Sequence, residues 1–256
     1  MRLDVALLPR ALRKPDSNTC LLIDALRASS SIVTLFAQGA EEVVVAGSIA
    51  SARRLVAREP GRYLLCGERF GLAPPGFDYG NSPSEFAAID MRGRRLVLAT
   101  TNGTKALHAL AASPVVLVGA LLNATAAVET LLAEARSRHL DATLVCAGLE
   151  RGNAFSLEDA FVAGALVETA VEEAQRGGAS LALSDPALAA CRLYQSYRGD
   201  ALACFREAQH GRSLIGIGLE RDLEFCAQID RYHAVPRLQR DASGQLSLVA
   251  STKGKT

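Results

Sequence analysis

The chain has 256 residues, of which 49% are hydrophobic, and a formal net charge of +1. This length suits one large α/β domain or two small ones, and a charge so close to zero gives no reason to expect a nucleic acid or a strongly acidic partner. The six cysteines are too widely spaced for a zinc knuckle or a CxxC redox pair. The first residues do not resemble a signal peptide, and no apolar run approaches the roughly 20 residues of a membrane span. We therefore expect a reduced, cytoplasmic protein without a membrane partner.

Strand-like apolar runs alternate with helical patterns through most of the chain. The runs are rich in β-branched residues or leucine and are uninterrupted, as expected of strands buried on both faces. In chain order, the predicted strands are 5–8, 20–23, 42–46, 62–66, 95–99, 114–118 and 142–146, and the predicted helices are 29–38, 49–58, 104–112, 124–139 and 157–175. This alternation predicts a three-layer α/β/α fold with a largely parallel or mixed sheet.

The sequence changes character after Gly178. Residues 184–230 indicate helices broken by glycines, 234–250 indicate a final hairpin around Ser243-Gly244, and 251–256 (STKGKT) indicate a disordered tail. Because no fixed repeat and no long linker is present, we predict one domain over residues 1–256. A subdivision near residue 178, into an α/β core and a helical C-terminal part, is the alternative.

One long segment, 67–83 (GERFGLAPPGFDYGNSP), has no predicted strand or helix before its last residues and is rich in glycine and proline. Structureless loops of this length are usually functional or disordered. Because the segment carries aromatic residues and few charges, we favour an ordered loop that borders a site, with Asp78 and Asn81 near that site. We also predict a short helix that starts at Asn81 and Ser82, with Pro83 in its first turn.

Polar residues gather directly after several predicted strands, as in DALRASSS (24–31) and TTNGT (100–104). Ligands bind at the carboxyl ends of strands in open parallel sheets, and helix N-termini there favour anions. Helix capping alone would explain any single one of these turns. The candidate substrate-binding residues are Ser29, Ser30, Ser31, Arg69, Asn81, Ser82, Thr101, Asn102, Gly103, Thr104 and Asn123.

Acidic residues lie next to these turns in the sequence or follow other strands. Asp24 and Glu68 directly follow strands, whereas Glu158 and Asp159 lie in the first turn of a helix behind Ser156, where helix capping is the alternative. Carboxylates beside an anion cradle suit a magnesium phosphoryl site, because oxygen ligands hold the ion and arginines help to neutralise the phosphoryl group. The candidate metal ligands are Asp24, Glu68, Glu158 and Asp159, and the candidate catalytic residues are Asp24, Arg27, Glu68 and Asp159.

Several familiar motifs are absent. The sequence has no GxxxxGK[ST] phosphate loop, no GxSxG nucleophile elbow and no GxGxxG after a strand, which argues against the corresponding nucleotide-binding and serine-hydrolase classes. Cys146 at a strand end is interpreted as a packed cysteine, with a thiolate at an anion site as the alternative. His210 is interpreted as a surface histidine, although its setting resembles a motif.

Several segments, in this order, resemble the 2-phosphosulfolactate phosphatase (ComB-like) family. They are IDALRASSSI (23–32), GER (67–69), GFDYGNSP (76–83), TTNGTKAL (100–107), LLNATA (121–126), CAGLERGNAFSLEDAFVAG (146–164), HGRSL (210–214) and GLERDLEFCAQID (218–230). The resemblance covers nearly the whole chain. The chain departs from the family pattern at Ser29, where threonine is expected, and between Gly148 and Phe155, which is longer and more charged than expected.

This resemblance implies a Mg²⁺-dependent phosphatase that converts 2-phospho-3-sulfolactate into 3-sulfolactate and phosphate in coenzyme M biosynthesis. The same chemistry on another phosphorylated hydroxy acid is one alternative. A non-catalytic protein that binds a small phosphorylated and sulfonated or carboxylated acid is another. Transfer of phosphate to Asp24 and direct attack by water both stay open, and a homodimer is considered.

Overall fold

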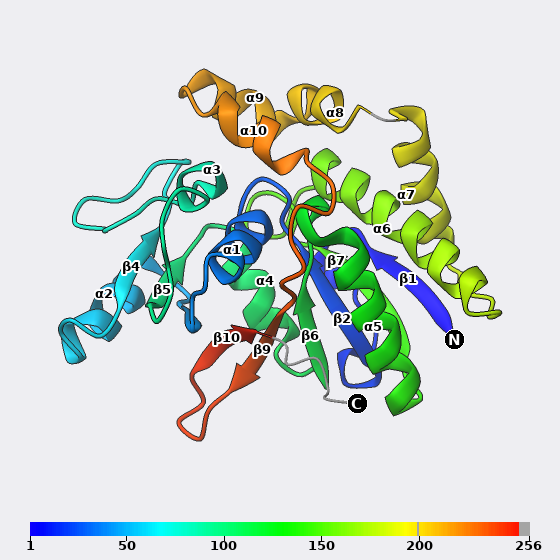
Figure 1. The fold of residues 1–256 in the computed structure, drawn as a ribbon, viewed down its shortest axis with the longest axis horizontal. Coiled ribbons are helices and arrows are strands. Elements are labelled where there is room, and N and C mark those ends of the chain that lie inside the picture. The colour runs from blue at the N-terminus through cyan, green and yellow to red at the C-terminus, as the bar shows by residue number, and fades with distance from the viewer. Residues whose placement is uncertain (199, 251–256) are drawn as a thin grey trace.

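The computed structural model describes residues 1–198 and 200–250. Within these residues, ten strands form one mixed sheet with helices on both faces (Figure 1), which confirms the predicted α/β/α class. The strands are β1 Arg2–Ala6, β2 Asn18–Ile23, β3 Glu42–Val45, β4 Leu64–Gly67, β5 Arg95–Ala99, β6 Val115–Val118, β7 Asp141–Cys146, β8 Ala182–Leu183, β9 Pro236–Arg240 and β10 Leu246–Ala250.

The helices agree closely with the predicted ranges. They are α1 Ala28–Ala37, α2 Ile49–Arg58, α3 Pro83–Phe86, α4 Gly103–Leu110, α5 Ala124–Arg138, α6 Leu157–Arg176, α7 Asp185–Ser196, α8 Ala201–Glu207, α9 Gln209–Gly216 and α10 Glu220–Cys226. The sequence missed the two-residue strand β8 and placed β1 two to three residues too late. The predicted disordered tail, 251–256, lies outside the described residues.

The sheet consists of two blocks of parallel strands, β4-β5-β3 and β6-β2-β7-β1-β8, joined by the antiparallel hairpin of β9 and β10. The strand order is β4-β5-β3-β10-β9-β6-β2-β7-β1-β8, and β9 and β10 pair antiparallel with each other and with the neighbouring block on either side. The two blocks therefore run in opposite senses along the sheet. The residues that follow β2, β4 and β5 nevertheless meet at one cavity.

The C-terminal hairpin is thus a central part of the sheet, although it comes last in the chain. Its turn is held by Asp241, whose Oδ1 accepts hydrogen bonds from the backbone N–H groups of Ser243 and Gln245 at 2.8 and 2.9 Å. The predicted hairpin is confirmed, but its central position was not predicted. β8, β9 and β10 all follow residue 178 and lie in the same sheet as β1–β7. The single-domain organisation stays a prediction.

The core lies on both faces of β2. Leu21 and Ile23 pack on one side with residues of α5 and α6, whereas Cys20 and Leu22 pack on the other with residues of α1 and α4. Alternate side chains of a strand point to opposite faces, and here both faces are covered by helices. This burial fixes the end of β2, where Asp24 begins the site.

The helical C-terminal part covers one end of the molecule. α7 lies along α6, while α8, α9 and α10 lie beyond the ends of the strands, at the top of Figure 1. Gly164 of α6 allows the close approach to α7, because a Cβ atom at this position would lie 2.0 Å from the carbonyl oxygen of Ala190. Among the described residues, no helix is long and apolar enough to cross a membrane.

Candidate active site

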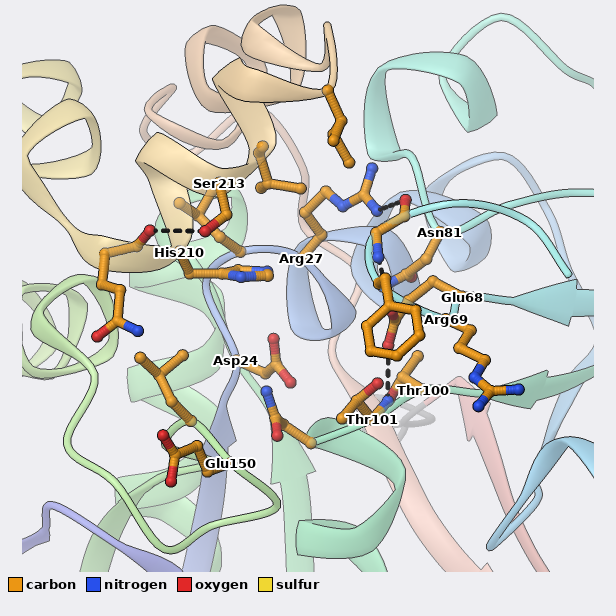
Figure 2. Close-up of a pocket in the computed structure, with 18 of the residues that line it drawn as sticks. Asp24, Arg27, Glu68, Arg69, Asn81, Thr100, Thr101, Glu150, His210 and Ser213 are labelled. Carbon is orange, nitrogen blue, oxygen red and sulfur yellow. Dashed lines mark hydrogen bonds between the residues drawn. The ribbon is translucent and has the colours of Figure 1, made fainter.

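A cavity of about 450 Å³ opens where the ends of β2, β4, β5 and β7 meet helix α9. Figure 2 shows side chains from all of these segments around it. The predicted site residues Asp24, Arg27, Glu68, Arg69, Asn81, Thr101 and Asn102 line the cavity. The structure therefore brings together residues that are far apart in the sequence and that follow strands, although these strands belong to two blocks of opposite sense and do not share one carboxyl edge.

Asp24 lies between the end of β2 and the start of α1. Its Oδ1 accepts a hydrogen bond from the backbone N–H of Ala28 at 3.0 Å, and its backbone carbonyl accepts one from the N–H of Ser29 at 2.9 Å. The side chain lines the cavity although the residue is only 6% exposed. Asp24 is thus a firmly held carboxylate that borders the cavity.

The turn before α4 touches this carboxylate through Gly103. A Cβ atom at position 103 would lie 2.6 Å from the Cβ of Ala28 and 2.8 Å from Oδ2 of Asp24. Only glycine leaves the space that Asp24 occupies. The candidate residue Gly103 therefore acts by its lack of a side chain, and it does not itself line the cavity.

We expect Gly103→Ala to displace Asp24 and to lower kcat by about tenfold or more, because small misplacements of reacting groups have large effects on rate. The crowding should also cost about 1–3 kcal/mol of stability. Steady-state kinetics and urea unfolding would measure the two effects. Gly216→Ala is the control, since a Cβ there meets no atom within 4 Å. Equal kinetics for the two variants would contradict the assigned contact.

Glu68 connects the ends of β4 and β5. Its Oε1 accepts a hydrogen bond from the N–H of Thr101 at 2.7 Å, and its Oε2 accepts one from the N–H of Gly71 at 3.0 Å. The side chain is half-buried and lines the cavity. Because Glu68 takes up the N–H of Thr101, that group is not free to bind an anion as the sequence suggested.

Asp159 differs from its predicted role. Its Oδ1 accepts a hydrogen bond from the N–H of Ala25 at 2.8 Å, and its Oδ2 accepts one from the N–H of Gly148 at 3.0 Å. It is buried and does not line the cavity. Asp159 therefore braces the ends of β2 and β7 behind the site. Its neighbour Glu158 is also buried outside the cavity lining, and its Oε2 has no hydrogen-bond partner among the described residues.

The predicted metal ligands do not form one cluster. In the part of the chain that the structure describes, no group of three or more His, Cys, Asp or Glu side chains is placed to hold a metal ion. Asp24 and Glu68 are the two predicted ligands that line the cavity. Oxygen ligands suit Mg²⁺, which keeps several waters and often takes only one or two protein carboxylates. The residues present therefore fit a magnesium ion held by Asp24 and Glu68.

Burial raises the pKa of Asp24 to about 7, and the negative charges of Glu68 and Glu158 act in the same direction. Burial, together with the charges of Asp24 and Glu158, also raises the pKa of Asp159 well above its usual range. Neighbouring buried carboxylates repel one another, and this repulsion favours binding of a proton or a cation between them.

A raised pKa makes the folded protein bind a proton that the unfolded chain releases. The stability gained in this way is present below the unfolded pKa of about 4 and is lost as the pH rises toward about 7. We therefore expect, in EDTA, that the unfolding free energy falls between pH 4 and pH 7 by roughly 3 kcal/mol more in the native sequence than in Asp24→Asn. Urea unfolding at several pH values measures this. Identical pH profiles would show that Asp24 has an ordinary pKa.

The hydroxyl groups of the turn at 100–104 cap α4. The backbone N–H of Thr104 donates to Oγ1 of Thr100 at 3.1 Å, and Oγ1 of Thr104 donates to the carbonyl of Thr100 at 2.9 Å. Thr104 is buried and does not line the cavity, so its hydroxyl has a structural role within the turn. Asn102 differs, because it makes no side-chain cap, and its Oδ1 accepts a hydrogen bond from the N–H of Arg151 at 2.8 Å.

We expect Asn102→Ala to raise KM several-fold while costing less than about 1 kcal/mol of stability. The lost bond joins two loops at the cavity, and a half-exposed hydrogen bond contributes little to folding. KM and melting temperature should be measured together. Asn153→Ala is the control. Asn153 does not line the cavity, and its Nδ2 donates a hydrogen bond within its own loop, to the carbonyl of Glu150. A large stability loss with unchanged KM would make Asn102 purely structural.

Several predicted substrate-binding residues hold the backbone instead. The hydroxyl groups of Ser29, Ser30 and Ser31 donate to the carbonyls of Asp24, Ala25 and Asn81, respectively. Asn123 is fully buried, and its side chain bonds the backbone of Ala120 and Ala234. Ser82 caps α3. None of Ser29, Ser30, Ser31, Ser82, Thr104 and Asn123 lines the cavity, so we leave their side chains out of the ligand-binding set.

The long loop borders the cavity as predicted, through Arg69, Phe70 and Asn81. The short helix α3 begins at Pro83, with Ser82 as its N-cap, which confirms that part of the prediction. Asp78 is the exception. Its Oδ2 accepts a hydrogen bond from the N–H of Leu65 at 2.7 Å, so it holds the loop against the edge strand β4 and does not line the cavity.

Arg27 is held by a residue that the sequence analysis missed. Its NH1 forms a buried ion pair with Oδ2 of Asp222 at 2.7 Å, and its NH2 donates to the carbonyl of Gly71 at 2.5 Å. Asp222 belongs to α10 and is 1% exposed. An acidic residue in the first turn of a helix has an ordinary explanation in the helix dipole, and the only available signal was its place in the 218–230 segment.

The sequence also missed part of the cavity wall. His210 of α9 lines the cavity, and in Figure 2 its imidazole points toward the space above Asp24. Burial, with a contribution from Arg27, lowers the pKa of His210 below its usual value. Glu150 and Arg151 also line the cavity, with φ angles of 49° and 63°. Such left-handed backbone is strained in non-glycine residues and is concentrated at functional sites.

Cys146 is buried at the end of β7 outside the cavity lining. Burial raises the pKa of its thiol well above the usual range, and the charges of Asp159 and Glu158 add to this effect. A reactive thiolate needs the opposite shift. The structure therefore favours the packed cysteine over the thiolate alternative.

The fold and the cavity describe an α/β protein with a carboxylate- and arginine-lined site at strand ends. The model of the 2-phosphosulpholactate phosphatase family matches residues 6–241, and the chain belongs to this family. A protein of Thermosynechococcus vestitus named probable 2-phosphosulfolactate phosphatase is 37% identical over 84% of this chain and 87% of its own length. A protein with the same name from Synechococcus sp. (strain JA-2-3B'a(2-13)) is 41% identical over 84% of this chain and 86% of its own length. Another from Gloeobacter violaceus is 36% identical over 93% of this chain and 95% of its own length.

Proposed function

We propose that the protein is a phosphoric monoester hydrolase that converts 2-phospho-3-sulfolactate into 3-sulfolactate and phosphate. The names of the relatives supply the substrate. The observation that carries the proposal is the cavity, where the buried carboxylate of Asp24 faces a space also lined by arginines and by Glu68. This combination suits a small, multiply anionic phosphoester.

The charges around the cavity support a bound cation. Three carboxylates (Asp24, Glu68 and Glu150) and three guanidinium groups (Arg27, Arg69 and Arg151) line the cavity, so acidic and basic side chains are equal in number. A substrate with phosphate, sulfonate and carboxylate groups would add a large negative charge. We propose that Asp24 and Glu68 would hold Mg²⁺, which when bound would supply positive charge to balance the substrate and to polarise its phosphoryl group.

The protein groups would orient the substrate for phosphoryl transfer. Asp24 is fixed by the N-terminus of α1, and Glu68 is fixed by two backbone N–H groups, so neither side chain needs to reorganise during the reaction. Arg27 is fixed in the same way by Asp222 and Gly71. Asp24 is also the residue best placed to receive the phosphoryl group if the reaction passes through a phospho-enzyme.

Phosphate release from an aryl phosphate, with Mg²⁺ and with EDTA, tests the proposed activity without assuming the natural substrate. We expect release with Mg²⁺ and a return to background with EDTA. Asp24→Asn serves as the control for contaminating phosphatases. No release under either condition, with the protein folded, would favour the alternative of a non-catalytic binding protein. The homodimer stays a prediction that the mass of the protein in solution tests.

A further inference from the structure

His210 presents its imidazole to the cavity. The residue belongs to helix α9 and lines the cavity, and Figure 2 shows its ring pointing toward the space above Asp24. Figure 2 marks no hydrogen bond to this ring. The ring nitrogens of a half-buried histidine need a partner from the protein, from water or from a ligand. Here that partner would be a molecule in the cavity.

The surroundings favour the neutral form of this imidazole. His210 is the second residue of α9, where the positive end of the helix dipole disfavours a cation. Burial lowers the pKa of His210, the charge of Arg27 acts in the same direction, and the charge of Glu68 opposes them. A neutral imidazole has one nitrogen with a free lone pair, and this nitrogen can take up a proton.

Close packing fixes the place of His210. A Cβ atom at Gly211, the next residue, would lie 1.7 Å from the carbonyl oxygen of Phe205 in α8. Only glycine therefore lets α9 approach α8 so closely. Leu214, one turn further along α9, is only 1% exposed and anchors the helix in the core. The imidazole is thus carried by a helix that is held at both ends.

The turn at Gly71 links this helix to two other residues of the cavity. The N–H of Gly71 donates to Oε2 of Glu68 at 3.0 Å, and its carbonyl accepts a hydrogen bond from NH2 of Arg27 at 2.5 Å. A Cβ atom at Gly71 would lie 3.5 Å from Cδ2 of Leu214, so α9 packs directly on this turn. One short turn therefore sets the position of His210 relative to Glu68 and Arg27.

Hydrolysis of a phosphoester needs a group that takes a proton from the attacking water, and such a base typically contributes about 10²–10⁴-fold to the rate. Guanidinium groups have no lone pair to offer, which excludes the arginines of the cavity. Both oxygens of Glu68 already accept backbone N–H groups, and Asp24 is assigned to the cation and the phosphoryl group. Glu150 is exposed, and a carboxylate in water is a weaker base than imidazole. His210 has none of these commitments.

We propose that His210 is the general base for the water that attacks phosphorus. The proposal rests on the proposed function and adds a residue to its mechanism. As the water oxygen bonds to phosphorus, one ring nitrogen of His210 takes a proton from that water. The bond that breaks joins phosphorus to the 2-oxygen of sulfolactate, or to Asp24 if a phospho-enzyme forms first. In the first case His210 passes the proton to the departing alkoxide. In the second it passes the proton to solvent, which replaces the one that the alkoxide took when it left.

His210→Gln tests the base, because glutamine fills a similar space but takes up no proton at neutral pH. We expect kcat to fall by about a hundredfold or more, with KM no more than about threefold above native, for both an aryl phosphate and 2-phospho-3-sulfolactate. Both substrates should be affected because the base acts on the water that they share. A loss confined to 2-phospho-3-sulfolactate, which has the poorer leaving group, would make His210 an acid for the leaving oxygen and would overturn the proposal.

His108→Gln is the matched control. His108 also lies in a helix, α4, but it is exposed and does not line the cavity. This variant should keep the native kcat and KM. In His210→Gln, a raised KM with native kcat would show that the imidazole only binds the substrate, and native values of both would show that it takes no part. Either result contradicts the base.

Added imidazole distinguishes proton transfer from a structural role. His210→Ala leaves a space at the cavity wall, and free imidazole in that space should raise turnover in proportion to its concentration, by about tenfold or more. Pyrazole, a ring of the same size and a much weaker base, should not. Equal effects of the two rings, or no effect of imidazole on a variant that circular dichroism shows to be folded, would count against the base.

The native protein separates this proposal from the proposed function. Native phosphate release that persists undiminished in His210→Gln would reject the base and leave the phosphatase intact. No release by the native protein from either substrate would contradict the proposed function itself, and the base with it.

Discussion

Asp24→Asn should reduce Mg²⁺-dependent phosphate release by roughly a thousandfold or more while leaving the protein folded. The substitution removes the charge of the most deeply buried carboxylate that lines the cavity, yet Oδ1 can still accept the hydrogen bond from Ala28. Loss of the charge would weaken both the hold on a cation and any attack on phosphorus. Kinetics and circular dichroism on the same preparation would measure rate and folding.

Asp159→Asn is the informative comparison. Both oxygens of Asp159 accept backbone N–H groups, so an asparagine would place an NH₂ group against one donor. We expect Asp159→Asn to lower the free energy of unfolding because two N–H groups would then face each other. Any loss of activity should follow from displacement of the ends of β2 and β7. If Asp24→Asn instead loses only a few-fold in kcat, Asp24 caps α1 and another residue carries the chemistry.

Asp222→Ala should cost about 3–5 kcal/mol of stability, because it leaves the buried charge of Arg27 without its partner. It also removes the acceptor that the hydroxyl groups of Ser82 and Ser84 share. Urea unfolding measures the loss, and a raised KM should accompany it because Arg27 is no longer held at the cavity.

Asp90→Ala is the control for this variant. Asp90 pairs with Arg92, and both side chains are largely exposed, so the expected cost is below about 1 kcal/mol. Similar costs for the two variants would mean that Arg27 finds water or another partner when Asp222 is absent. The assigned role of Asp222 would then fail.

The strands and helices could be predicted from the sequence because their signals are local. α2 matches its predicted range, and the hairpin of β9 and β10 was expected from its turn residues. The central position of that hairpin could not be predicted. It depends on pairing with β3 and β6, which lie more than a hundred residues earlier, and the hydrophobic pattern does not specify the partner of a strand.

The site was predicted in part for a related physical reason. Ser31, Thr104 and Thr101 all follow strands, and short polar residues at such positions serve equally well as helix caps or as ligands. Only the folded chain shows that Ser31 and Thr104 bond the backbone while Thr101 lines the cavity. Asp222 and His210 come from the helical C-terminal part, where no strand end marks them.

The central claim is that the cavity hydrolyses a phosphoester that carries a sulfonate. The most direct test is kcat/KM for phosphate release from 2-phospho-3-sulfolactate and from 2-phospholactate, which differs by the missing sulfonate, both with Mg²⁺. The account predicts a value at least about a hundredfold higher for the sulfonate substrate, as expected when charged groups of a site lose their partner. Equal values, a preference for 2-phospholactate, or no release from the sulfonate substrate would contradict it.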